Sequence, residues 1–74
     1  MSETQKSIFI TGAASGLGRE VARYFANVGW FVGLADVNEK GLDETAALLP
    51  AGQWSRQRLD VTDRAQWKAA VADF

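Results

Sequence analysis

The residues with the clearest chemical meaning lie between Thr11 and Gly18, where three glycines follow an apolar segment. Glycine has no Cβ atom, so the backbone of such a turn can approach a phosphate group closely. Gly12 permits the turn out of the apolar segment, and Gly16 and Gly18 allow close approach to a ligand and to neighbouring backbone. The residues after the turn have helical spacing, and the N-terminus of a helix attracts anions. The segment therefore predicts a phosphate-binding turn.

Asp36 is the second residue with a chemical role, because it ends the next apolar segment about 20 residues after Gly16. A carboxylate at this place can accept hydrogen bonds from both hydroxyls of an adenosine ribose, and it would repel a 2′-phosphate. No Lys or Arg adjoins it, since Val37 follows and Ser15 occupies the turn. This charge pattern favours NAD over NADP. The alternative is that Asp36 only caps the following turn or helix.

Asp60 and Val61 form the third candidate, after a third segment of the chain. The aspartate and its flanking backbone could contact the edge of an adenine, while the valine packs on the ring. The alternative is that Asp60 only begins a turn before the next helix. The three candidates together predict a site for an adenine dinucleotide, although the glycine spacing is G-x-x-x-G-x-G and not the general G-x-G-x-x-G.

The elements that must position these residues follow from the apolar pattern, whose period changes several times along the chain. Two short apolar runs and a third, more polar run predict strands, and three runs with helical spacing predict the helices that follow them. The predicted order is strand 7–11, helix 17–28, strand 30–35, helix 39–49, strand 54–59 and helix 64–74. This βαβαβα order implies an α/β fold with a parallel sheet and right-handed crossovers.

Each predicted helix has one apolar stripe that should face the core. The stripe of the first helix is Leu17, Val21, Tyr24, Phe25 and Val28, and Arg19, Glu20, Arg23 and Asn27 take the opposite, solvated face. The stripes of the other two are Leu42, Thr45, Ala46 and Leu49, and Trp67, Ala70, Val71 and Phe74. The strand 54–59 carries two arginines, which suits the edge of a sheet.

Local signals mark the ends of the predicted helices. Gly29 is placed to end the first helix in a left-handed conformation. Asn38 is a favourable N-cap for the second helix, although Gly41 within its first turn costs about 1 kcal/mol relative to alanine. Asp63 and Gln66 have the spacing of a capping box for the third helix.

Composition excludes several classes of protein. The 74 residues include 8 basic and 9 acidic side chains, a net charge of −1, which gives no basic excess for nucleic acid. A hydrophobic content of 47% argues against disorder, and no apolar run is long enough to span a membrane. The chain has neither cysteine nor histidine, so we expect no disulfide, no common zinc site and no Ser-His-Asp triad. A cytoplasmic protein is the default expectation.

The segment Thr11-Gly12 to Gly16-Leu17-Gly18, with Asp36 and the run 60–63, resembles the N-terminal cofactor-binding part of the classical short-chain dehydrogenase/reductase family. The resemblance extends from residue 8 to residue 74. It implies a three-layer Rossmann-type unit with strand order 3-2-1, the first half of a doubly wound domain, over residues 1–74. It also implies that the cofactor is NAD(H). In the family pattern the pyrophosphate is lined by Gly12, Ser15, Leu17 and Gly18, the ribose is bound by Asp36, and the adenine is bound by Asp60 and Val61.

The family's catalytic residues are absent from the 74 residues. Members have an Asn-Ala-Gly segment, a catalytic serine and a Tyr-x-x-x-Lys pair, whereas the only tyrosine here, Tyr24, is followed four positions later by Val28. We therefore expect no catalytic residue and no metal ligand in this chain. The parent protein would transfer hydride between NAD(H) and an alcohol or carbonyl substrate, with its catalytic residues beyond Phe74.

Two other functions remain open from the sequence. The chain could act as a non-catalytic module that binds a nucleotide or associates with itself, or as a Rossmann unit that binds S-adenosylmethionine. Self-association is expected because strand order 3-2-1 would leave the apolar strand 8–10 at an edge of the sheet, where it invites pairing with another chain. A homo-oligomer is therefore expected, with neither a nucleic-acid nor a membrane partner.

Overall fold

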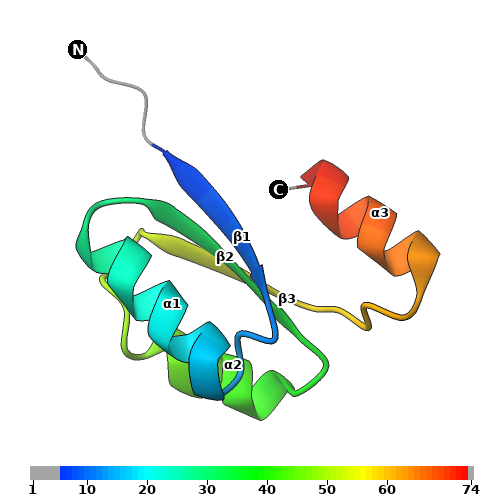
Figure 1. Cartoon of the computed structure of the whole chain (residues 1–74), viewed down its shortest axis with the longest axis horizontal. Helices are drawn as coiled ribbons and strands as arrows, with labels where there is room; N and C mark the ends of the chain where they lie inside the picture. The colour runs from blue at the N-terminus through cyan, green and yellow to red at the C-terminus, as the bar shows by residue number, and fades with distance from the viewer. Residues whose placement is uncertain (1–5, 74) are drawn as a thin grey trace.

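The computed structural model describes residues 6–73, which form three parallel strands and three helices in alternation (Figure 1). The elements are β1 (Ser7–Thr11), α1 (Gly16–Asn27), β2 (Phe31–Asp36), α2 (Glu39–Ala46), β3 (Trp54–Arg58) and α3 (Arg64–Asp73). The sheet order is β1-β2-β3, which is the predicted 3-2-1 order. The predicted α/β Rossmann-type unit is confirmed, with element ends that differ from the prediction by a few residues.

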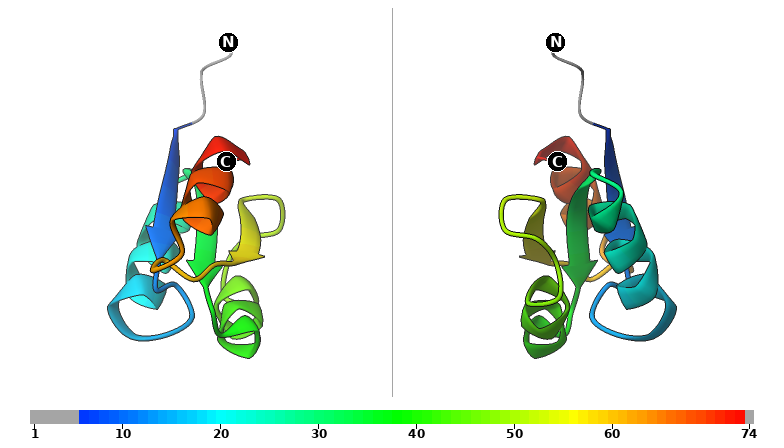
Figure 2. Two further views of the ribbon diagram at one scale, coloured as in Figure 1. Left: turned by 90° about the vertical axis from the view of Figure 1, so that its right-hand side faces the viewer. Right: turned by 90° about the vertical axis from the view of Figure 1, so that its left-hand side faces the viewer.

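The elements form three layers. Helices α1 and α2 cover one face of the sheet, and α3 lies on the opposite face (Figure 2). The larger core lies under α1 and α2, where Ile10, Val32 and Leu34 of the strands meet Leu42 of α2. A smaller cluster of Ala35, Leu59 and Ala70 lies under α3. The central strand β2 is buried along residues 32–35, as expected for a strand covered on both faces.

The predicted core stripe of α1 is only partly correct. Val21 and Phe25 pack against the core, but Leu17, Tyr24 and Val28 are exposed. Ala22 and Ala26 are the buried residues of this helix. Small side chains let α1 lie close to the sheet, so the core face is shifted toward the alanines and away from the bulky residues. Tyr24 was expected to be a core ring, and it instead packs edge-on against Phe25 at the surface.

The stripe of α2 is confirmed, because Leu42, Thr45, Ala46 and Leu49 are all buried. Among residues 64–72 of α3 only Ala70 is buried, while Trp67 and Val71 remain about half exposed. Phe74, the last residue of that predicted stripe, lies outside the described residues.

The end signals of the helices are confirmed by their hydrogen bonds. The side chain of Asn38 accepts from the backbone N–H of Gly41 at the start of α2, and Gly29 follows α1 with φ +94°. Asp63 Oδ1 accepts from two N–H groups at the start of α3. Gln66, however, accepts from the backbone N–H of Asp60 and not from that of Asp63, so the reciprocal half of the capping box is wrong.

Strand β3 lies at the edge of the sheet, as its polar sequence predicted. Arg56 extends from it to α2, where its Nε lies 3.0 Å from Asp43 Oδ1 and its Nη1 lies 3.8 Å from Glu39 Oε1. Arg56 is one of the two arginines that indicated an edge strand, and it connects this edge to α2 through ion pairs.

Candidate nucleotide-binding site

The glycine turn joins the carboxyl end of β1 to the N-terminus of α1. Gly12 and Gly16 have φ values of +68° and +59°, a left-handed conformation that favours glycine. Gly18 lies where α1 passes the turn, and a Cβ atom there would be 2.1 Å from the carbonyl oxygen of Gly12. The three glycines have two different roles: Gly12 and Gly16 allow the left-handed conformation of the turn, and Gly18 permits the close contact between the turn and α1.

The middle of the turn is held by the protein itself. The N–H of Ala13 donates to Ala35 O in β2, and the N–H of Ala14 donates to Asp36 Oδ2. Because these two N–H groups are bonded, the groups that can meet an anion are those of the following residues, at the start of α1. The first N–H groups of a helix have no partner within the helix. Ser15 is the N-cap of α1, and its hydroxyl makes no capping hydrogen bond within the part of the chain that the structure describes.

Asp36 lies beside the turn, at the carboxyl end of the central strand. Its Oδ2 accepts from Ala14 N at 3.1 Å, and its Oδ1 accepts from Asn38 N at 3.0 Å. A carboxylate has about four lone-pair sites, so two remain for a ligand. The carboxylate therefore ties the glycine turn to the start of α2 and still has one acceptor site on each oxygen.

The ends of β2 and β3 enclose a hollow of about 210 Å³. Its lining brings together four of the eight residues that the sequence singled out, with two neighbours; the lining is Gly12, Asp36, Val37, Leu59, Asp60 and Val61. The other four, Ser15, Gly16, Leu17 and Gly18, follow on the turn and the first turn of α1. The candidate residues thus lie on the segments that follow the carboxyl ends of the three strands.

Asp60 lies on one side of this hollow, and its neighbours stabilise its charged form. Its Oδ1 accepts from the hydroxyl of Thr62 at 2.6 Å and from the backbone N–H of Thr62 at 2.9 Å. These hydrogen bonds, with a smaller contribution from the charge of Arg58, hold the pKa of Asp60 below its usual value. Since both bonds are to Oδ1, Oδ2 is the oxygen left for a ligand.

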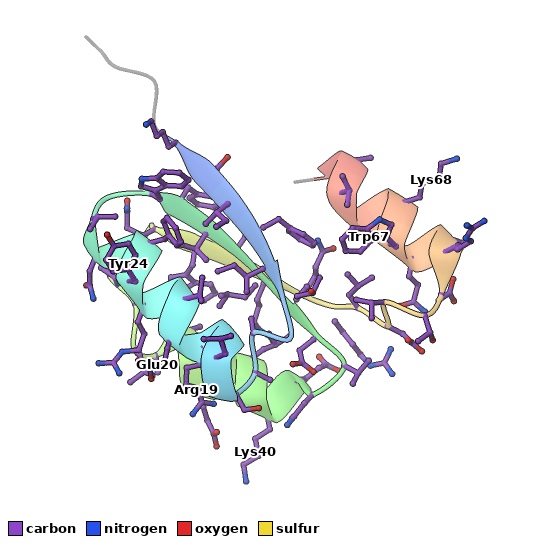
Figure 3. The ribbon with its side chains drawn as sticks, viewed as in Figure 1. Arg19, Glu20, Tyr24, Lys40, Trp67 and Lys68 are labelled. Atoms are coloured by element: carbon purple, nitrogen blue, oxygen red, sulfur yellow. The ribbon has the colours of Figure 1, made fainter. Side chains whose placement is uncertain are left out.

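A second hollow, of about 360 Å³, lies beside the first and shares Val61 with it. Thr11, Arg64 and Trp67 complete its lining. Trp67 faces the sheet (Figure 3), where its ring meets that of Phe9 edge-on at 5.9 Å. Of the three tryptophans, Trp30 packs on Phe25, Trp54 packs on the core, and only Trp67 borders the site.

Arg19 lies near the turn, in a place that the sequence did not predict. It was assigned to the solvated face of α1, but its side chain is only 26% exposed and points to α2. Its guanidinium donates to Thr45 Oγ1, to the carbonyl oxygens of Ala14 and Gly41, and to Glu44. Thr45 is the residue of the sequence that indicates this contact, because a hydroxyl within an apolar stripe needs a hydrogen-bond partner when it is buried. Arg23, the other arginine of that face, is exposed and pairs only with Glu20 among the described ion pairs.

Other kinds of site are not found within residues 6–73. No group of three acidic, histidine or cysteine side chains in this range could hold a metal ion, and no helix in it is long and apolar enough to cross a membrane.

A parallel sheet with helices on both faces and a glycine turn at a helix N-terminus defines a class of proteins, the Rossmann-type nucleotide-binding domains. In this class the ligand lies across the carboxyl ends of the strands. The family model for short chain dehydrogenases matches residues 6–74, and the chain belongs to that family. It corresponds to the N-terminal part of the family's members, as the resemblance predicted.

The relatives and structural neighbours are longer proteins. The chain is 44% identical over 69 residues to a 2,5-dichloro-2,5-cyclohexadiene-1,4-diol dehydrogenase of Sphingobium indicum. This match covers 90% of this chain and 28% of that protein. A family member from Burkholderia phymatum in complex with NAD superimposes with a TM-score of 0.85 and 39% identity over 93% of this chain and 25% of its own. An actinorhodin polyketide ketoreductase with NADPH superimposes with a TM-score of 0.84 and 32% identity, over 93% of this chain and 27% of its own. The chain thus spans about a quarter of the length of these proteins.

Proposed function

We propose that the site binds NAD(H) in preference to NADP(H). The diphosphate would lie on the N–H groups of residues 15–18 and on the hydroxyl of Ser15. The adenosine ribose would donate its two hydroxyls to the two remaining acceptor sites of Asp36, and the adenine would enter the hollow beside Asp60 and Val61. The observation that carries this proposal is the hydrogen bond between Asp36 Oδ2 and Ala14 N, which puts the carboxylate against the turn.

The charge of Asp36 supports NAD over NADP. A 2′-phosphate would have to lie against a carboxylate whose oxygens already accept two N–H groups, and Val37, which follows, is exposed and offers no charge. One cation is near, because Arg58 pairs with Asp36 in the sheet register. This pair forms across the sheet, so the neighbours of Asp36 along the chain do not reveal it. Arg58 stabilises the charge of Asp60, so we expect it to soften the preference without reversing it.

We propose that the parent protein transfers hydride between NAD(H) and an alcohol or carbonyl substrate. The bound nicotinamide would supply the hydride, and the residues of this chain would bind and orient the cofactor. The catalytic serine and the Tyr-x-x-x-Lys pair of the family are absent from the 74 residues, so we expect these residues alone to be inactive. A homo-oligomer and a cytoplasmic location, both expected from the sequence, stay predictions; sedimentation of the parent protein would test the first.

The test is a titration of the chain with NAD⁺, NADP⁺ and S-adenosylmethionine, followed by NMR of the backbone amides. We expect NAD⁺ to bind at least about tenfold more tightly than NADP⁺ and to shift the amides of residues 15–18 and the indole of Trp67. In Asp36→Asn the affinity for NAD⁺ should fall about tenfold or more, because charged acceptors contribute roughly 1.5–3 kcal/mol per hydrogen bond. Tighter binding of NADP⁺ would overturn the preference, and binding of S-adenosylmethionine alone would replace the dinucleotide with that ligand.

A further inference from the structure

Thr45 is the buried polar residue of the larger core, and its hydroxyl connects α2 to the glycine turn. The side chain is fully buried, and Oγ1 donates to the carbonyl oxygen of Ala13 at 2.7 Å. The same oxygen accepts from Arg19 Nε at 2.9 Å. One hydroxyl thus serves as donor to the turn and as acceptor for α1, at the place where three segments meet.

Arg19 makes the second connection. Its Nη2 donates to Ala14 O at 2.5 Å and to Gly41 O at 3.3 Å, and the same atom lies 3.3 Å from Glu44 Oε1. The guanidinium therefore lies behind the turn, between α1 and α2, with its donors directed at protein oxygens. This arrangement leaves it poorly placed to bind a phosphate on the other side of the turn.

Gly41 completes the contact by its lack of a side chain. A Cβ atom at this position would lie 2.6 Å from Ala14 Cβ and 2.9 Å from Ala14 O, so only glycine lets α2 come this close. The cost that Gly41 imposes on the first turn of α2 therefore has a structural reason.

All four backbone polar groups of Ala13 and Ala14 are consequently bonded to the protein. Their N–H groups donate to β2 and to Asp36, and their carbonyl groups accept from Thr45 and Arg19. The peptide planes of these two residues are fixed from both sides. The orientation of the next residues, which begin α1, follows from them.

We propose that Thr45 and Arg19 are positioning residues that hold the glycine turn from behind, so that α2 determines how tightly the turn binds a diphosphate. This inference rests on the proposed function. Without the two bonds, the buried carbonyl of Ala13 would lack a partner and the turn would shift to expose it to water. The ligand would then have to order the turn as it binds, and its affinity would fall.

The experiment compares two ligands and two pairs of variants of the chain. NAD⁺ contains the diphosphate, whereas adenosine contains only the ribose and base, so a turn that has lost its orientation should weaken NAD⁺ alone. Thr45→Val removes the hydroxyl at similar volume, and Thr45→Ser keeps it. Arg19→Met removes the guanidinium, and Arg23→Met removes an equal charge from the exposed face of the same helix.

We expect Thr45→Val and Arg19→Met to weaken NAD⁺ binding about tenfold each, as the loss of one such hydrogen bond allows. Their affinity for adenosine should change less than about twofold, and Thr45→Ser and Arg23→Met should bind NAD⁺ as the unaltered chain does. A general loss of folded protein would lower both affinities by the same factor, and circular dichroism at the titration temperature measures that loss directly.

Three results would overturn the inference. Unchanged NAD⁺ binding in Thr45→Val and Arg19→Met would show that the turn keeps its orientation without them. An equal loss for NAD⁺ and adenosine would reduce both residues to a structural role. Failure of the unaltered chain to bind NAD⁺ would refute the proposed function itself, and this proposal with it. If either principal variant does not fold, Thr45→Ser and Arg19→Lys decide, since the first should keep NAD⁺ affinity and the second should lose it.

Discussion

Gly18 is the position at which the substitution of one hydrogen by a methyl group should do most harm to the site. A Cβ atom there would lie 2.1 Å from Gly12 O, 2.7 Å from Gly12 C and 3.2 Å from Ala13 Cα. All three are backbone atoms of the glycine turn, so no side-chain rotation can relieve the contact. Gly18→Ala must therefore move either the turn or the start of α1.

The size of the effect follows from two opposing contributions. Alanine in place of glycine within a helix should stabilise the protein by about 1 kcal/mol. Overpacking costs about 1–3 kcal/mol, and contacts with rigid backbone belong at the upper end of that range. We expect a net loss of about 2 kcal/mol in the free energy of unfolding. For a domain of this size, that corresponds to a fall of roughly 10 °C in Tm.

Gly29→Ala is a matched control at the other end of α1. Gly29 has φ +94° and open space around its missing Cβ, so alanine there introduces backbone strain of about 1–2 kcal/mol without a steric contact. Both variants should have a lower Tm than the unaltered chain, as measured by circular dichroism. Only Gly18→Ala should lose NAD⁺ binding at a temperature at which both are folded. A Tm of Gly18→Ala equal to that of the unaltered chain, or an affinity for NAD⁺ equal to that of Gly29→Ala, would contradict this prediction.

Three further predictions concern the surroundings of the site. Thr62→Val removes the largest cause of the lowered pKa of Asp60, so that pKa should rise toward its ordinary value of 3.8 in a carboxyl NMR titration. Because its pKa is lowered in the folded state, ionised Asp60 stabilises the unaltered chain, and this contribution is complete above pH 3.8. It should disappear as the pH falls through the folded-state pKa. Thermal melts of the unaltered chain and the variant across about pH 2–5 measure the difference. Asn38→Ala removes the N-cap of α2 and should lower the free energy of unfolding by about 1 kcal/mol in urea titrations, an effect that Asn38→Ser should largely avoid. Arg56→Ala breaks the exposed ion pairs with Glu39 and Asp43, so it should cost less than about 1 kcal/mol and even less in high salt.

The fold was predictable because its signals are local. A strand that is covered on both faces must be apolar throughout, and residues 32, 34 and 35 of β2 satisfy this without reference to the rest of the chain. Asn38 and Gly29 bond to groups within a few residues, so their types alone mark the helix ends. The strand order came from the family resemblance, which the sheet confirms.

The face of α1 was less predictable, because the periodicity of large apolar residues and the direction of the core differ there. Leu17 and Tyr24 repeat at helical spacing but remain exposed, and the described helix turns Ala22 and Ala26 toward the sheet. Alanine adds little to an apolar stripe when residues are weighted by size. It decides the packing here because a close approach between helix and sheet requires small side chains.

The role of Arg19 depends on residues about 25 positions away in α2, and no local pattern contains that information. Thr45 offered an indirect sign, as a hydroxyl on a stripe that proved to be fully buried. A buried hydroxyl predicts that some partner exists, but its identity is set by how α1 and α2 pack. The candidate residues were identified by type, whereas the groups that orient them required the tertiary structure.

The glycines near the site serve two different physical purposes, and this difference explains why the site and the packing of the helices are coupled. Gly12 and Gly16 adopt a left-handed backbone, and a Cβ atom on either would meet open space, so glycine is needed there for the conformation of the turn. Gly18 and Gly41 have space for a hydrogen atom only, and each lies against the turn from a different helix. The turn is therefore clamped between the starts of α1 and α2. A change that separates these two helices alters the phosphate-binding backbone even when no residue of the turn is replaced.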